Sequence, residues 1–232
     1  MEQNISIENT NADNLKRLNH YDVFEVIDTF NIEKNLGCKV LNDWMTVEGN
    51  LTNTEDELVT QAREKLELKW DEWNEEELKM HFISLIFFVA KIEIPKLIST
   101  FYERRFAGRV DEINISLIVD CMVASTTNSG LPKSPYFFLQ EVASKAFSEE
   151  YDENDNGYNP EGQMLAAMIL AQEKNKDNKP LFGSWIQGRF WYFTVLSGND
   201  YCVSKPFDAT DNDALLKIVS ILRKLKDLIL NR

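Results

Sequence analysis

The sequence lacks the motifs that assign a chain to several common classes of site. Its three cysteines, Cys38, Cys121 and Cys202, are far apart and form no CxxC pair. That spacing argues against a disulfide framework or a cysteine zinc site, and it favours a reducing compartment. The two histidines, His20 and His81, have no nearby partners for a zinc site or a catalytic triad. The chain also has no glycine-rich phosphate loop and no dinucleotide-binding fingerprint.

Long hydrophobic runs and a positive charge balance are missing as well. The longest apolar run, 82–90, covers about half of a membrane-crossing helix. Residues 1–14 are polar, which predicts a disordered tail rather than a signal peptide. We therefore expect a soluble cytoplasmic protein with no membrane partner. A formal charge of −13, from 38 acidic and 25 basic residues, opposes non-specific nucleic-acid binding but leaves room for a local basic cleft.

The order of hydrophobic patterns predicts an α/β protein. Residues 15–72 carry broken helical patterns, which we interpret as an N-terminal helical extension of an α/β domain over 73–232. The elements expected in that domain are a helix, a hairpin, a strand, a helix, a second hairpin and a final helix, at 75–91, 105–123, 135–143, 160–174, 181–196 and 211–230. This order predicts a mixed central sheet flanked by helices.

Two of the predicted strands end in a carboxylate. Asp120 follows the apolar run 115–119, and Glu141 follows the run 136–140. Buried carboxylates are costly unless they are paired, hydrogen-bonded or bound to a metal. On neighbouring strands the two side chains point into a shared pocket, where oxygen ligands suit Mg²⁺ or Mn²⁺. Strand-end acids also cap loops or pair with arginine, and arginines are present in 104–109, so both interpretations stay open.

Three further residues are candidates for the same site. Glu75 or Glu76, at the start of the helix before the sheet, supplies a third acid to the metal. Gln163, early in the next helix, holds a substrate phosphate or orients the attacking water. The alternative for the two glutamates is a first turn that complements the helix dipole, and for Gln163 it is an ordinary solvent-facing position.

Six segments resemble, in the same order, the motifs of the PD-(D/E)XK nuclease-like families. They are a helix start, three strand motifs, a helix beginning with Asn-Pro-Glu-Gly-Gln, and an aromatic hairpin, at 73–83, 102–109, 119–120, 135–141, 159–168 and 183–193. Together they cover the chain from residue 73 to about 227. The resemblance implies a restriction-endonuclease-like fold and hydrolysis of phosphodiester bonds in DNA or RNA with Mg²⁺ or Mn²⁺.

The resemblance also implies a role for each candidate. The helix acid that helps to bind the metal corresponds to Glu75 or Glu76. The two strand ligands correspond to Asp120 and Glu141. The helix glutamine of the family corresponds to Gln163.

The chain departs from the family pattern at the catalytic lysine, two residues after the strand glutamate. Ala143 occupies that position, and loss of a cation aimed at the transition state costs several kcal/mol of barrier. Lys145, about 6.6 Å further along the same strand face, is a candidate replacement; in the alternative it is solvated and the site is weak or inactive. The sequence thus predicts a nuclease with impaired activity or, alternatively, an inactive nuclease-fold binding or interaction module.

Overall fold

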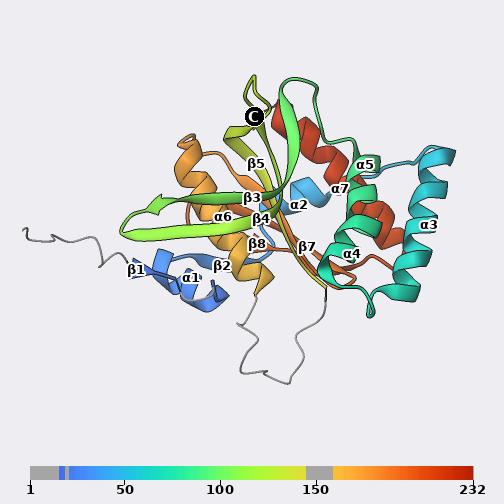
Figure 1. The fold of residues 1–232 in the computed structure, drawn as a ribbon, viewed down its shortest axis with the longest axis horizontal. Helices are drawn as coiled ribbons and strands as arrows, with labels where there is room; N and C mark the ends of the chain where they lie inside the picture. The colour runs from blue at the N-terminus through green and yellow to red at the C-terminus, as the bar shows by residue number, and fades with distance from the viewer. Residues whose placement is uncertain (1–15, 19–20, 145–158, 232) are drawn as a thin grey trace, which may run out of the picture.

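A single mixed β-sheet forms the centre of the protein. The computed structural model describes residues 16–18, 21–144 and 159–231 (Figure 1). The strands are β1 (Lys16–Arg17), β2 (Glu33–Leu36), β3 (Ile98–Val110), β4 (Ile113–Thr126), β5 (Pro132–Ala143), β6 (Leu181–Gln187), β7 (Phe190–Ser197), β8 (Asp200–Val203) and β9 (Phe207–Asp208). Their order is β1-β4-β5-β6-β7-β8-β2, with β3 paired to β4 and β9 paired to β7.

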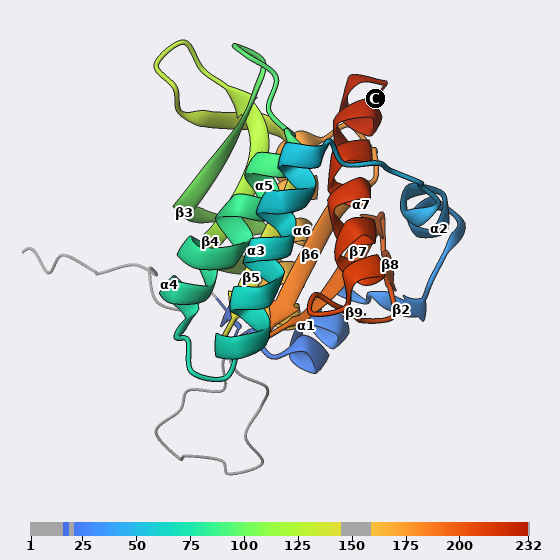
Figure 2. The same ribbon diagram turned by 90° about the vertical axis from the view of Figure 1, so that its right-hand side faces the viewer.

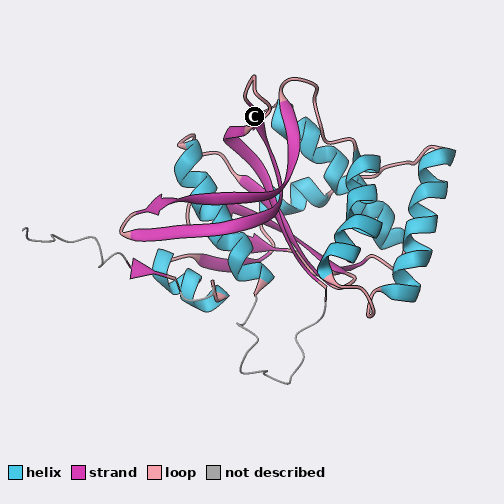
Figure 3. Ribbon diagram, in the orientation of Figure 1, coloured by secondary structure: helices cyan, strands magenta, loops and turns pink. Residues whose placement is uncertain are grey.

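Helices cover both faces of this sheet (Figures 2 and 3). They are α1 (Val23–Phe30), α2 (Lys39–Met45), α3 (Asn53–Lys69), α4 (Glu75–Leu78), the π-helical segment η1 (Lys79–Ile83), α5 (Ser84–Ala90), α6 (Pro160–Asn175) and α7 (Asn212–Leu230). One hydrophobic core joins one face to α2, α3, α5 and α7. The second core joins the opposite face to α1 and α6. The predicted mixed sheet flanked by helices is confirmed.

The sheet combines antiparallel hairpins with one parallel crossover. β3, β4 and β5 are antiparallel neighbours, and β6, β7 and β8 are antiparallel neighbours. β5 and β6 are parallel, so the chain between them must cross one face of the sheet, and α6 forms that crossover. The expected first hairpin is present, but β3 begins at Ile98, before the expected start at residue 105.

Residues 15–72 contribute more than the expected helical extension. They form α1, α2 and α3, and they also add β1 and β2 to the central sheet. β2 pairs in parallel with β8, from Glu33 beside Asp200 to Leu36 beside Val203. The expectation of helix alone was therefore wrong for these strands. All four residues of β2 are exposed, so main-chain pairing rather than an apolar pattern forms this strand.

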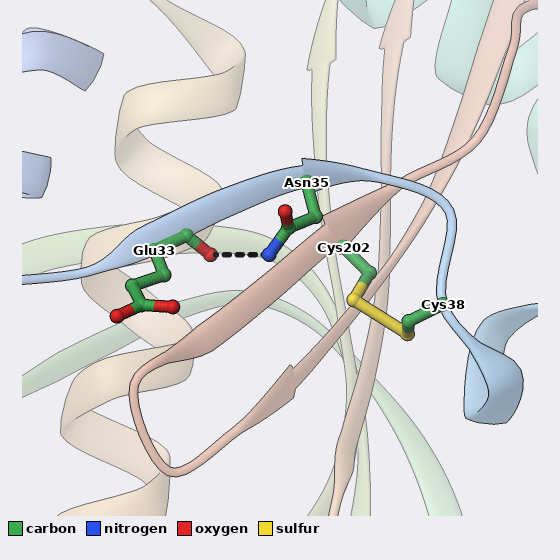
Figure 4. Close-up of a disulfide and its surroundings, with 4 residues drawn as sticks. All are labelled: Glu33, Asn35, Cys38 and Cys202. Atoms are coloured by element: carbon green, nitrogen blue, oxygen red, sulfur yellow. Dashed lines mark hydrogen bonds between the residues drawn. A yellow bond between two sulfur atoms is a disulfide. The ribbon is translucent and has the colours of Figure 1, made fainter.

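A disulfide connects the N-terminal segment to the sheet. Cys38, between β2 and α2, is bonded to Cys202 on β8, with the two Cα atoms 5.9 Å apart (Figure 4). The expectation of unpaired thiols was wrong at these two positions, because the parallel pairing of β2 with β8 brings together residues 164 positions apart. Cys121 is a buried free thiol.

Six of the nine residues in the apolar run 82–90 are buried, whereas Phe88 is 71% exposed. Phe82, Ile86 and Val89 in η1 and α5 are each no more than 1% exposed. They pack in the core between the sheet and α7. In the part of the chain that the structure describes, no helix combines the length and the apolar character needed to cross a membrane.

Gly162 allows α6 to lie against the start of α1. A Cβ atom at this position would lie 1.8 Å from the carbonyl oxygen of Tyr21 and 2.8 Å from the amide nitrogen of Val23. Asn159 caps the helix by accepting a hydrogen bond from the Gly162 N–H, at 3.0 Å, and Pro160 occupies the first turn. This close approach fixes the position of Tyr21 relative to α6.

We expect Gly162→Ala to lower the free energy of unfolding by about 1–3 kcal/mol, because the added methyl group collides with main-chain atoms. This loss exceeds the gain of about 1 kcal/mol in helix propensity. Urea denaturation followed by circular dichroism measures the change. Glu173→Ala, at an exposed position on the same helix, is the control and should shift stability by less than about 0.5 kcal/mol. Equal or greater stability of Gly162→Ala contradicts the close approach.

Candidate active site

Two buried carboxylates lie side by side on β4 and β5. The antiparallel register pairs Cys121 with Gln140, so Asp120 and Glu141 occupy the next position on each strand. Asp120 is 6% exposed and Glu141 is 1% exposed. The Asp120 Oδ2 atom accepts a hydrogen bond from the Val142 N–H at 2.7 Å. The sequence indicated this juxtaposition correctly, because each acid follows an apolar strand.

Four of the six candidate residues line one open cavity of about 540 Å³. They come from the start of α4, from β4, from β5 and from the first turn of α6, and are Glu75, Asp120, Glu141 and Gln163. Glu76 is not among the lining residues, and its side chain is 70% exposed. Lys145 lies outside the described residues. The cavity volume lies in the range of small-molecule sites, about 300–1,000 Å³.

A lysine that was not among the predicted site residues, Lys79, lies beside the cavity and contacts its carboxylates. Its ammonium Nζ lies 3.2 Å from Asp120 Oδ1 and 2.6 Å from Glu103 Oε1. It also lies 2.8 Å from Glu75 Oε1 and 2.8 Å from Glu76 Oε1. Only 13% of the Lys79 side chain is exposed. The sequence does contain a local signal for this residue. Lys79 lies four residues after Glu75 and three after Glu76 at the start of a helix, which is the spacing at which helical side chains form ion pairs.

Local helix geometry positions Lys79 over the strands. Asn74 caps α4 through a reciprocal capping box with Glu77, which begins the helix at Glu75 as the sequence predicted. The expected continuous helix over 75–91 is interrupted, because η1 begins at Lys79 with π-helical geometry. A π-helical turn inserts a residue into the α-helical repeat and recurs at functional sites. Here it coincides with the residue that contacts Asp120.

Burial and charge repulsion shift the acid equilibria of the site. Burial raises the pKa of Asp120 to about 7, and the nearby Glu75 carboxylate adds to the rise, while Lys79 opposes it. Burial also raises the pKa of Glu141 well above its ordinary range, with a further contribution from Asp120. For Lys79, hydrogen bonds to glutamates, with Glu103 first, outweigh the effect of burial and raise the pKa above its ordinary value.

The donor chemistry of the cavity suits a hard divalent cation. Its carboxylates and the Gln163 amide oxygen are the ligand types that Mg²⁺ and Mn²⁺ prefer. A divalent charge beside Asp120 and Glu141 would offset the burial and the charge repulsion that raise their pKa values. Among the residues described, however, no three His, Cys, Asp or Glu side chains are already grouped to hold a metal ion. The metal site therefore stays a prediction.

We expect Lys79→Met to lower the free energy of unfolding by about 2–3 kcal/mol at pH 8, because it leaves the buried Asp120 carboxylate without its ammonium partner. The loss should be smaller at pH 5. The folded-state pKa of Asp120, about 7, lies above the unfolded value of about 3.9. The folded protein thus holds more protons between these values, and its stability falls as the pH rises through this window. In Lys79→Met the free energy of unfolding therefore decreases more steeply as the pH rises.

Urea denaturation with a chelator present measures these differences at both pH values. Lys69→Met is the control, because Lys69 pairs with Glu72 on the exposed surface and such pairs contribute at most about 1 kcal/mol. Adding Asp120→Asn to Lys79→Met should restore most of the stability at pH 8. An equal loss at both pH values, or no rescue, contradicts the assigned partnership.

Comparison of the chain with protein-family models and with curated proteins found no match. The resemblance to PD-(D/E)XK nucleases thus depends on the motif residues themselves. What the structure adds is their arrangement, in which Glu75, Asp120, Glu141 and Gln163 line one cavity beside the Lys79 ammonium.

Proposed function

We propose that this protein is a metal-dependent nuclease with a restriction-endonuclease-like fold of the PD-(D/E)XK type. One observation carries the proposal. Four side chains that the resemblance assigns to a nuclease site come from separate elements and line a single cavity. The Lys79 ammonium lies beside that cavity, 3.2 Å from Asp120 Oδ1, whereas the family position for lysine is occupied by Ala143.

Three carboxylates would hold Mg²⁺ or Mn²⁺, namely Glu75, Asp120 and Glu141. The bound ion supplies charge neutralisation at the phosphate and lowers the pKa of an attacking water. The Val142 N–H keeps one oxygen of Asp120 oriented, at 2.7 Å. The Lys79 ammonium near the other oxygen, at 3.2 Å, favours the ionised form of Asp120 and opposes the effect of burial.

Hydrolysis adds a water oxygen to phosphorus and breaks one P–O bond to a sugar, which leaves a phosphomonoester and a hydroxyl group. In this account Lys79 replaces the lysine that Ala143 cannot supply, and its charge stabilises the negative charge that develops on the phosphoryl oxygens. Gln163 donates from its amide group to the phosphate or orients the water. Because Lys79 comes from η1 rather than β5, it reaches the site from the helix side.

A non-catalytic binding or interaction module is the second candidate. The observation that favours it is the number of carboxylates that already surround Lys79, which leaves little uncompensated positive charge for a phosphate. A positive charge committed to four acids stabilises a transition state less than a free one does. The two candidate functions are distinguished by whether the protein cleaves nucleic acid in the presence of a divalent metal ion.

We expect cleavage of DNA or RNA oligonucleotides that requires Mg²⁺ or Mn²⁺ and is lost with a chelator. Asp120→Asn and Glu141→Gln should each lower the rate at least about 100-fold, because each removes a charged ligand. Lys79→Met should lower it by about 10²–10³-fold, as for other lost transition-state contacts. Gel analysis of labelled single-stranded DNA, duplex DNA and RNA measures the rates.

Asp200→Asn is the matched control, because Asp200 is exposed on β8, and it should keep the wild-type rate. Thermal melts establish that each variant is folded. If the wild-type protein and Asp120→Asn are equally inactive on all three substrates with either metal, the catalytic proposal fails and the binding module replaces it.

A further inference from the structure

A second cavity adjoins the carboxylate pocket and continues along the β3–β4 hairpin. Its volume is about 770 Å³. It shares Tyr21, Arg105 and Ser116 with the carboxylate pocket, and it extends to Arg109 and Asn114 near the end of the hairpin. The two cavities therefore meet at Arg105 and form one continuous groove that ends at the acids.

Strand alternation explains which residues face this groove. The antiparallel register places Arg105 beside Ile118 and Arg109 beside Asn114. These residues lie on one face of the hairpin, because successive side chains in a strand point to opposite faces. The other face carries Phe106, which packs in the α6 core. α6 thus lies against one face of the hairpin (Figure 1), and residues on the other face line the groove.

The groove carries positive charge where it enters the acidic pocket. Within the described ranges, Arg105 is exposed and has no carboxylate at ion-pair distance. Arg109 pairs with Glu112 at 3.0 Å, but both side chains are exposed, and such pairs are weak enough to exchange for a phosphate.

Tyr21 forms a fixed wall of the groove. Its hydroxyl donates a hydrogen bond to the Ser116 carbonyl at 2.8 Å and accepts one from the Ser116 N–H at 2.8 Å. Its backbone adopts φ = 51°, a region that non-glycine residues occupy at a cost when surrounding contacts require it. Its carbonyl oxygen lies so close to Gly162 on α6 that no side chain fits between them. The wall is therefore pre-formed.

We infer that this groove binds a single-stranded segment of a polynucleotide and leads its phosphodiester backbone into the carboxylate pocket. Arg105 and Arg109, four residues apart and so about 13 Å along the strand, contact phosphates. Ile118, which is 58% exposed, lies beside Arg105 and offers an apolar surface to a base. Base faces are free for such contacts in single strands but stacked in duplexes. The choice of a polynucleotide as the ligand rests on the proposed nuclease function.

Overall charge also favours a single strand. With a net charge of −13, the protein repels phosphates over most of its surface. A narrow line of arginines neutralises one backbone, whereas a duplex presents two charged strands. A groove that ends at buried acids also suits a flexible strand, which bends to place one phosphodiester at the pocket.

The test is binding of fluorescent twelve-residue oligo(dT), oligo(U) and a duplex hairpin to the full-length Asp120→Asn protein with Mg²⁺, followed by anisotropy at several salt concentrations. We expect oligo(dT), oligo(U) or both to bind more tightly than the duplex. Arg105→Gln combined with Arg109→Gln should weaken that binding at least about 10-fold and reduce the salt slope by about 0.7 for each lost phosphate contact. Ile118→Ala should weaken it about fivefold or more.

Arg104→Gln is the matched control. Arg104 is the chain neighbour of Arg105 but points away from the groove, where its guanidinium carbon lies 5.9 Å from the centre of the Phe101 ring, so its substitution should leave affinity unchanged. Binding of no oligonucleotide, equal binding by the double arginine variant, or tighter binding of the duplex overturns the inference. Arg105→Lys should retain most of the affinity, which separates loss of charge from misfolding.

Failure of this inference and failure of the proposed function are distinguishable. If the protein cleaves nucleic acid with a metal ion but its binding of oligonucleotides does not depend on Arg105 and Arg109, the groove inference fails and the proposed nuclease function stands. If the protein binds single strands through these arginines but the wild-type protein never cleaves them, the groove inference stands and the proposed nuclease function fails.

Discussion

The contact between the Lys79 ammonium and the Asp120 carboxylate, 3.2 Å apart, is the interaction on which the rest of the site depends. Asp120 and Glu141 sit side by side at the ends of two apolar strands, where an uncompensated negative charge is costly. Lys79 brings a positive charge to this position and is itself held by Glu75, Glu76 and Glu103. These ion pairs connect α4 and η1 to β3 and β4, and they hold the ionisable side chains of the site close together.

Several structural details serve this arrangement. The capping box at Asn74 begins α4, and the π-helical segment that follows directs Lys79 toward β4. On the other side of the cavity, Gly162 lets α6 approach Tyr21, so that Gln163 and Tyr21 face the same space. The parallel step from β5 to β6 requires the α6 crossover. Topology therefore places an acidic pocket beside the arginine-lined face of the β3–β4 hairpin.

The sequence predicted the parts of this site that follow from strand and helix patterns. Asp120, Glu141 and Gln163 were identified because each follows a clear apolar run or helix start. Lys79 was missed because its partners on β3 and β4 are 24 and 41 residues away, and no local pattern specifies them. The Cys38–Cys202 disulfide and the exposed strand β2 were missed for the same reason, since both arise from long-range pairing.

The central claim is that Asp120 and Glu141 bind a divalent cation while Lys79 remains beside Asp120. A crystal structure with Mn²⁺, examined by anomalous diffraction at the manganese edge, tests it most directly. The account predicts an anomalous peak within ligand distance of both carboxylates, about 2.0–2.6 Å, with the Lys79 ammonium still near Asp120. A fully ordered site with no peak at saturating Mn²⁺, or a peak bound only by surface acids, contradicts the account.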